Sequence, residues 1–313
     1  MVSPTIYHLS ILRRLQHRLT LVLSHEFSDL QISSTDLTRI IDNLFQEGWI
    51  KNWISLINPN SNKHSFLWLK TNPREPRYLD IFQQYYDRNI LSSLIGITGE
   101  FSLLAYFQFP DEQTYLETLE ELDLSFSQLD LPDRYHWQEV LSVQKWNGFD
   151  SRQTPDSYSI SESQKEILRV LQNPDNTRQH PNAQTVADKV NKTQSTAYRI
   201  IKKLSDDNII LGHTIEVSDK LRPSCKAILQ LKVHPRGLQE TIDSLISNPS
   251  INSIFRTSEE FNLLLEVFVY NIEEYNSFLK QIYLDLSSVI DSRSNIVLDD
   301  IIIPLPYIFP IYY

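Results

Sequence analysis

One short stretch of this sequence concentrates side chains that bind nucleic acid. Guanidinium, amide and hydroxyl groups hydrogen-bond to base edges in the major groove of DNA, and ammonium groups bind phosphates. The residues of the stretch that carry such groups are Lys192, Gln194, Ser195, Tyr198, Arg199, Lys202 and Lys203. Their spacing indicates a surface that contacts double-stranded DNA. Arg199 and Gln194 are expected to contact bases, and the three lysines and Ser195 are expected to bind phosphates.

A helix must position these groups. Ala197, Ile200, Ile201 and Leu204 recur at the spacing of one buried helical face, so the polar residues lie on the opposite face. Thr193 is the expected N-cap, because its hydroxyl can accept from a backbone N–H of the first turn. An isolated helix of this kind is more often an ordinary surface helix, and its neighbours decide between the two interpretations.

The neighbouring segments favour a winged helix-turn-helix. A capping-box pattern at Ser161 opens a helix over 161–171, and a second short helix follows at 184–190. After the helix at 194–204, the segment 208–217 is expected to form a turn and a β-wing. Three helices and a wing in this order are typical of winged helix-turn-helix domains.

The composition and net charge of the chain limit the classes of protein to which it can belong. The chain has 313 residues, a net charge of −10 and 41% hydrophobic residues, values typical of a globular protein of two to four domains. No apolar run is long enough for a membrane span. The single cysteine, Cys225, excludes an intrachain disulfide and favours a cytoplasmic location. A small basic surface on an acidic body suits selective binding, because the body repels DNA elsewhere.

The two halves of the sequence align at an offset of 160 residues. Arg39 falls on Arg199, Gly48 falls on Asn208, and Phe101 falls on Phe261. The buried face of the helix recurs as well, at Leu37, Ile40, Ile41 and Leu44. Because one offset holds over a long stretch, the sequence indicates an internal duplication.

Each half continues into a second unit with the order βαββαβ. The expected elements lie at 226–233, 235–247, 251–257, 261–270, 272–287 and 295–303, and in the first half at 64–70, 77–88, 90–97, 101–109, 113–124 and 137–145. This order predicts a ferredoxin-like sandwich with helices on one face of an antiparallel sheet. The fold class is therefore α+β, as two tandem copies of a winged helix-turn-helix followed by a ferredoxin-like domain.

The expected domain boundaries follow from these patterns. They are a degenerate winged helix at 1–58, a ferredoxin-like domain at 63–147, a polar linker at 148–159, a DNA-reading winged helix at 160–222, and a ferredoxin-like domain with an apolar C-terminal tail at 223–313. The tail is too apolar for a free end, and it is expected to pack over a sheet of its own chain or of a partner.

A winged helix followed by βαββαβ resembles the Lrp/AsnC (feast/famine) transcriptional regulators. The local matches are Asp206-Asp207-Asn208-Ile209-Ile210-Leu211-Gly212-His213 and Thr98-Gly99-Glu100-Phe101. The resemblance implies a DNA-binding regulator of archaeal type, a homodimer formed through the ferredoxin-like (RAM-type) domains, and a small-molecule effector. It places the effector site at Gly99 and Glu100. A further expected partner is the transcription machinery, through the first winged helix.

The chain departs from this family pattern at two places. At the offset of 160, Thr38, Asp42 and Asn43 stand where the second copy has Tyr198, Lys202 and Lys203, so the first helix is expected to read DNA weakly or not at all. Glu259 stands where the first copy has Gly99, and this change favours the first copy for an effector site.

Motifs for catalysis, cofactors and metals are absent from the sequence. The enzymatic alternative is a relative of the siroheme decarboxylases, which also resemble Lrp/AsnC proteins as paired copies. Such an enzyme needs polar groups that converge between the two ferredoxin-like units, and the evident candidates are His64, His136 and Arg134. We therefore expect a regulator without a cofactor, with metabolite binding or decarboxylation as the alternative.

Overall fold

A computed structural model describes residues 6–16, 27, 32–71, 77–129, 134–153, 160–172, 182–221 and 223–302. The chain divides into two compact units, one from 1–58, 147–222 and 306–313, and the other from 59–146 and 223–305. Within the described ranges, no helix is both long enough and apolar enough to cross a membrane. The expected C-terminal tail beyond Ile302 and half of the expected linker, residues 154–159, lie outside the described residues.

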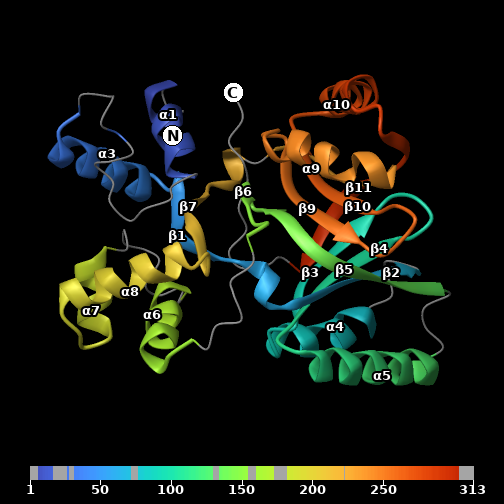
Figure 1. Ribbon diagram of the computed structural model, residues 1–313, viewed down its shortest axis with the longest axis horizontal. Helices are drawn as coiled ribbons and strands as arrows, with labels where there is room; N and C mark the ends of the chain where they lie inside the picture. Colours follow the sequence, from blue (N-terminus) through green and yellow to red (C-terminus); the bar gives the residue numbers. More distant parts are fainter. Residues whose placement is uncertain are drawn as a thin grey trace. The chain divides into compact units, whose positions relative to one another are not determined.

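The first unit holds the short helices of both halves of the chain (Figure 1). Its elements are α1 (Ile6–Leu15), α3 (Ser34–Gln46), β1 (Ile50–Ile57), β6 (Phe149–Asp150), α6 (Glu162–Gln172), α7 (Ala183–Lys189), α8 (Gln194–Asp206), β7 (Ile210–Val217) and the 3₁₀ turn η4 (Asp219–Leu221). Ile167, Val186, Ala197, Ile201 and Leu204 form a common core, so α6, α7 and α8 pack together as one three-helix cluster.

The strand expected to form a β-wing at 208–217 is present as β7, but its partner strand comes from the other half of the chain. The strand β7 forms after a turn at Asn208, whose φ of +55° lies in the left-handed region, and Gly48 has the same role in the first half at +74°. However, β7 pairs antiparallel with β1, with Trp53 opposite Ile215. The strand that follows the cluster of α6, α7 and α8 is therefore paired with a strand from the other half of the chain, because a lone strand leaves its N–H and C=O groups unpaired.

The second unit contains two successive βαββαβ segments. The first consists of η2 (Pro59–Ser61), β2 (Lys63–Lys70), α4 (Arg77–Asp87), β3 (Leu91–Ile97), β4 (Leu103–Phe109), α5 (Glu112–Leu129) and β5 (Arg134–Trp146). The second consists of β8 (Cys225–Val233), η5 (Pro235–Gly237), α9 (Leu238–Ile246), β9 (Ile251–Thr257), β10 (Leu263–Val269), α10 (Ile272–Asp285) and β11 (Val289–Ile302). The strands β3 and β9, and likewise β4 and β10, begin and end 160 residues apart.

The two sheets of this unit join edge to edge and close on themselves. The strand order is β2-β4-β3-β11-β8-β10-β9-β5, and β5 also pairs with β2. Each expected open sandwich is thus one half of a barrel-like sheet, and the joints are antiparallel, with Val297 opposite Ile97 and Val143 opposite Phe255. Closure removes the exposed strand edges that an open sheet would present to solvent.

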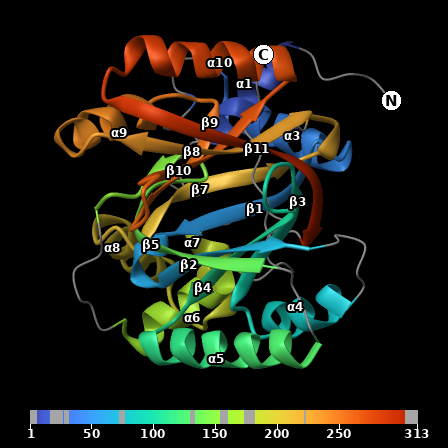
Figure 2. The same cartoon turned by 90° about the vertical axis from the view of Figure 1, so that its right-hand side faces the viewer.

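Three apolar layers hold this unit together (Figure 2). The helices α4 and α5 cover one sheet over Phe82, Tyr85 and Phe107, and α9 and α10 cover the other. Inside the closed sheet, side chains of both segments meet, among them Phe66, Tyr106 and Phe255. The Phe66 and Phe255 rings are 5.0 Å apart in an edge-to-face contact, a favourable geometry for aromatic pairs.

The last strand differs from its expected form. It begins at Val289, earlier than the expected 295, because its first half pairs with β8 and its second half with β3. The register shifts on both sides of Asp299-Asp300, as a bulge requires. These acidic residues therefore lie at a bend in an interior strand and not on an open edge.

Candidate nucleic-acid interface

The helix α8 begins and packs as the sequence predicts. The hydroxyl of Thr193 accepts from the backbone N–H of Thr196 at 3.3 Å, which confirms the N-cap. Ala197, Ile201 and Leu204 are buried, and Ile200 is half-buried. With one face fixed in the three-helix core, the opposite face is held towards solvent in a defined orientation.

A tight turn sets the angle between α7 and α8. Asn182 and Thr185 form a reciprocal capping box that begins α7. At the end of that helix, Asn191 takes a φ of +51°, and the N–H of Lys192 donates to the carbonyl of Ala187 at 3.0 Å. Asparagine tolerates this left-handed conformation, so the turn between the two helices is encoded locally.

The solvent face of α8 carries most of the residues expected to contact DNA. Gln194, Ser195, Arg199, Lys202 and Lys203 are exposed, and Tyr198 is 49% exposed. Among the residues that the structure describes, Arg199 and Lys202 meet no carboxylate. Two cations one helical turn apart are thus available to an anionic partner.

Lys192 differs from the other expected contacts. Its ammonium lies 3.1 Å from the carboxylate of Glu166 on α6, and the residue is half-buried. The pair joins the turn before α8 to another helix of the cluster. The sequence offered no signal for this contact, because Glu166 is one of two exposed acids on α6, with Glu162 as the other.

The corresponding helix of the first half, α3, has a different charge arrangement. Ser33 caps it as Thr193 caps α8, and its buried residues are Leu37, Ile41 and Leu44. However, the Arg39 guanidinium is paired with Asp36 at 2.9 Å. Thr196 stands at the position of Asp36 in α8, so the equivalent guanidinium of Arg199 keeps no such partner. The sequence holds this signal at the offset of 160, beside the changes at Thr38, Asp42 and Asn43.

The residues expected to bind an effector are engaged within the second unit. Gly99 has a φ of +109°, and a Cβ at this position would lie 2.5 Å from the side-chain amide of Asn295. The Glu100 carboxylate pairs with Arg134 at 2.5 Å. The missing Cβ of Gly99 therefore serves the packing of β11 against the turn.

The residues considered for catalysis do not converge. The Nε2–H of His64 donates to the Pro59 carbonyl at 2.7 Å, and Nδ1 accepts from the Tyr106 hydroxyl at 2.9 Å. Burial lowers the pKa of His64 to about 4, so the ring is neutral at pH 7. On the paired strands β2 and β5, Trp68 lies opposite His136, and His64 is four residues further along, roughly 13 Å away.

His136 and Arg134 are surface residues with acidic neighbours. His136 Nε2 lies 3.5 Å from Glu259, and Arg134 pairs with Glu100 as described above. Among the described residues, no group of three or more His, Cys, Asp or Glu side chains could hold a metal ion.

Comparison with known families gives a match in the second βαββαβ segment. Residues 226–304 match the family described as the Lrp/AsnC ligand binding domain. The matched segment runs from β8 to the end of β11, whereas the effector residues named from the sequence lie in the first segment. This part of the chain is therefore similar to the Lrp/AsnC ligand binding domain.

Two relatives are HTH-type transcriptional regulators of Pyrococcus. One, from Pyrococcus furiosus, is 24% identical over 115 residues, which are 36% of this chain and 77% of the relative. The other, regulator FL11 of Pyrococcus horikoshii, is 24% identical over 121 residues, 38% of this chain and 78% of the relative. Their source agrees with the archaeal origin expected from the sequence.

Over most of its length the chain is similar in fold to a solved enzyme structure. The siroheme decarboxylase NirDL has a TM-score of 0.64 and covers 94% of this chain and 91% of its own length, at 13% sequence identity. At this identity the likeness concerns the fold alone.

Proposed function

We propose that this chain is a DNA-binding transcriptional regulator of the Lrp/AsnC type, and that α8 enters the major groove. The observation that carries the proposal is the solvent face of α8, where Arg199 and Lys202 meet no acid among the described residues. A helix anchored by a three-helix core, with its polar face open, has the form of a recognition helix. The names of the Pyrococcus relatives support this reading.

The chain is proposed to be a tandem duplication that contains both halves of a family dimer. The element bounds that recur at an offset of 160 support this interpretation, as does the pairing of β1 with β7. In such an arrangement only one of two related helices reads sequence, because α3 has lost its free cation. The first helix-turn-helix then has a structural role or contacts the transcription machinery.

Two reading helices require two chains. We expect a cytoplasmic homodimer, with half-sites one helical turn of DNA apart or a multiple of it. Because the sheets of the second unit close on themselves, the dimer contact would use a surface other than a strand edge. A small-molecule effector remains part of the proposal, and the match of residues 226–304 to a ligand-binding domain supports it. Its placement at Gly99 and Glu100 rests on the sequence resemblance, because these residues lie outside the matched segment.

Selection from a random pool of duplex DNA tests the proposal. The purified protein should enrich a defined motif, and its affinity for that motif should fall steeply as the salt concentration rises from about 50 to 200 mM. Enrichment of no motif, together with affinity that does not respond to salt, would reject DNA recognition.

The enzymatic alternative has one observation in its favour, the similarity of fold to a siroheme decarboxylase over 94% of the chain. The position of His64, buried and four residues along β2 from the partner of His136, weighs against it. The alternative predicts that the purified protein binds an iron tetrapyrrole and shows its absorbance bands. A protein that binds the tetrapyrrole and selects no DNA would favour the enzyme.

A further inference from the structure

A cavity of about 590 Å³ opens in the first βαββαβ segment, and the turn at Gly99 is not part of its lining. Its walls come from the turn before β2, the end of α4, the start of β3, the end of β4 and the first turn of α5. The lining residues are Asn62, Arg88, Asn89, Ile90, Ser92, Gln108, Pro110 and Thr114. A cavity of this volume accommodates a small molecule.

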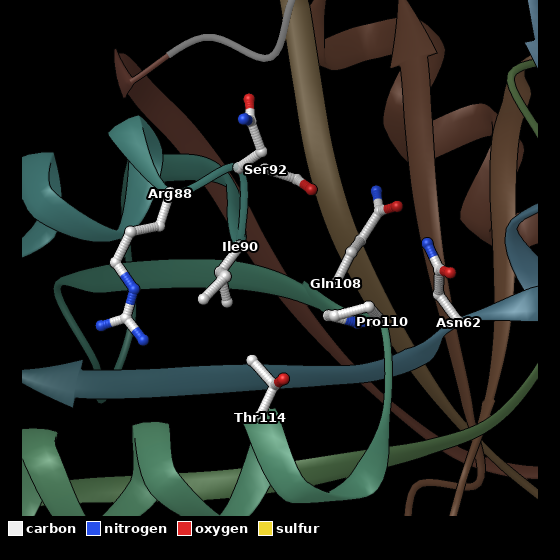
Figure 3. A pocket seen from close by; sticks show the side chains of 8 residues that line it. Asn62, Arg88, Ile90, Ser92, Gln108, Pro110 and Thr114 are labelled. Carbon is white, nitrogen blue, oxygen red and sulfur yellow. The ribbon is translucent and has the colours of Figure 1, made fainter. Parts of the chain in front are cut away.

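The cavity has two chemically different ends (Figure 3). The Gln108 and Asn62 amides lie on one side, the Arg88 guanidinium lies on the other, and Ile90 stands between them. The backbone bond from the Gln108 N–H to the Ile90 carbonyl, at 2.8 Å, fixes the spacing of the polar end and the apolar middle. The site is therefore built on rigid strands.

The polar end has unused hydrogen-bonding capacity. Ser92 and Gln108 are half-buried, and neither side chain has a hydrogen-bond partner among the residues that the structure describes. A half-buried amide offers an adjacent donor and acceptor, which is the pattern that glutamine and asparagine use on the edge of a base. Ile90 is buried and Pro110 is exposed at the mouth, so both present apolar surface to a flat ring.

The cationic end is held in place. The Arg88 guanidinium stacks over the Tyr85 ring at 5.4 Å, and its Nη1 bonds to Glu121 at 2.7 Å. The remaining N–H groups of Arg88 can donate hydrogen bonds to a phosphate, and the Glu121 carboxylate competes with the phosphate for the guanidinium.

The second segment does not repeat this arrangement. At the offset of 160, Phe268 and Tyr270 replace Gln108 and Pro110, and Asn252 replaces Ser92. The Asn252 amide lies 3.5 Å from the Glu266 carboxylate, and the Asn248 carbonyl, at the position of Arg88, accepts from Lys145 at 2.8 Å. The polar groups of the second segment are thus satisfied within the chain.

We propose that this cavity binds one mononucleotide per chain, with the base at Gln108 and Ser92 and the phosphate at Arg88. The amide end supplies recognition of the base edge, Ile90 and Pro110 contact its face, and the guanidinium holds the phosphate. This site is independent of the proposed DNA contact at α8.

Calorimetric titration of the full chain with AMP, GMP, CMP and UMP tests the proposal, with adenosine and inorganic phosphate as comparators. At least one nucleotide should bind at one per chain, more tightly than either comparator. Arg88→Gln and Gln108→Leu should each weaken binding about tenfold or more, since each removes a hydrogen bond that involves the ligand. Glu121→Gln should tighten it by freeing the guanidinium.

Matched controls keep the result specific. Arg236→Gln and Gln239→Leu change the same residue types at exposed positions of the second segment, and Arg199→Ala changes the face proposed for DNA; all three should leave nucleotide affinity unchanged. The proposal is overturned if no nucleotide binds at millimolar concentration, if phosphate alone binds as tightly, or if Arg88→Gln and Gln108→Leu bind like the unaltered chain.

Discussion

Arg199 and Arg39 are arginines at matching positions of α8 and α3. They differ in one neighbour, which decides whether the guanidinium is paired with a carboxylate. Asp36 neutralises Arg39, whereas Thr196 leaves Arg199 open. Exposed ion pairs contribute little to stability, but they change what the cation offers to a third group. Whether this guanidinium is available to a partner is therefore decided by one side chain, and Asp42 and Asn43 in place of Lys202 and Lys203 add to the charge difference between the two helices.

Substitutions on α8 should separate sequence preference from general affinity. Arg199→Ala should lower the discrimination between preferred and random DNA by about 1–3 kcal/mol, since it removes a base contact. Lys202→Ala should weaken binding to all sequences and reduce the salt slope by about 0.9, as expected for one phosphate contact. Titration of both DNAs at several salt concentrations measures both effects.

The control for these variants is Arg39→Ala, which should leave DNA affinity within about twofold because this guanidinium is already paired. Equal losses from all three variants would contradict a specific role of α8.

Burial of His64 should make the free energy of unfolding depend on pH. The pKa of the buried ring is lowered to about 4 from an ordinary value of 6.5, so the unfolded chain binds the proton first as the pH falls. Between pH 6.5 and 4 the folded state therefore loses about 2 kcal/mol relative to the unfolded state. His64→Gln keeps hydrogen-bonding groups without this titration, and urea unfolding at pH 7 and pH 4.5 should show a smaller loss for the variant. Equal losses would mean that His64 does not titrate in this way.

At the scale of elements, the two caps make a matched pair. Ser33 caps α3 and Thr193 caps α8, each through a side-chain oxygen that accepts from the third residue onward. The caps are alike in geometry, whereas the faces that follow them differ in charge.

Ser33→Ala and Thr193→Ala should each lower the free energy of unfolding by about 1 kcal/mol. Only Thr193→Ala should weaken DNA binding, because the first turn of α8 carries Gln194 and Ser195. Chemical denaturation and DNA titration of both variants provide the two readouts. A loss of DNA affinity in Ser33→Ala would indicate that the first helix also reads DNA.

At the scale of the whole molecule, contacts between segments far apart in sequence decide the form of the second unit. The turn at Gly99 packs against Asn295, and the Asn295 amide donates to the Thr98 carbonyl. This contact joins the first segment to the last strand, where β3 meets β11.

Gly99→Ala should destabilise the chain by about 1–3 kcal/mol, because its φ of +109° strains any side chain and its Cβ would meet the Asn295 amide at 2.5 Å. Gly96→Ala, in the adjacent strand β3, is the matched control, since its Cβ would meet Asp299 at an ordinary 3.8 Å. Urea unfolding of both variants tests the difference, and similar losses would argue against the clash.

The sequence by itself determined the local features of this protein. The cap at Thr193, the buried faces of α3 and α8 and the turn at Asn208 were predicted and confirmed, because each depends on residues within about one helical turn. At Ser161 half of the expected capping box forms, since the backbone N–H of Ser161 donates to the Gln164 side chain. The order of strands and helices in the second unit followed from the same kind of pattern.

Only the tertiary structure decided which segments meet. The pairing of β1 with β7, the closure of the two sheets, the contact of Lys192 with Glu166 and the cavity at Arg88 all join residues that the chain separates widely. Strand alternation predicts which face of a strand is buried, but any strand edge can pair with any other in register. Which strand edges pair depends on the free energy of the whole packed unit, and the local spacing of residues does not predict it.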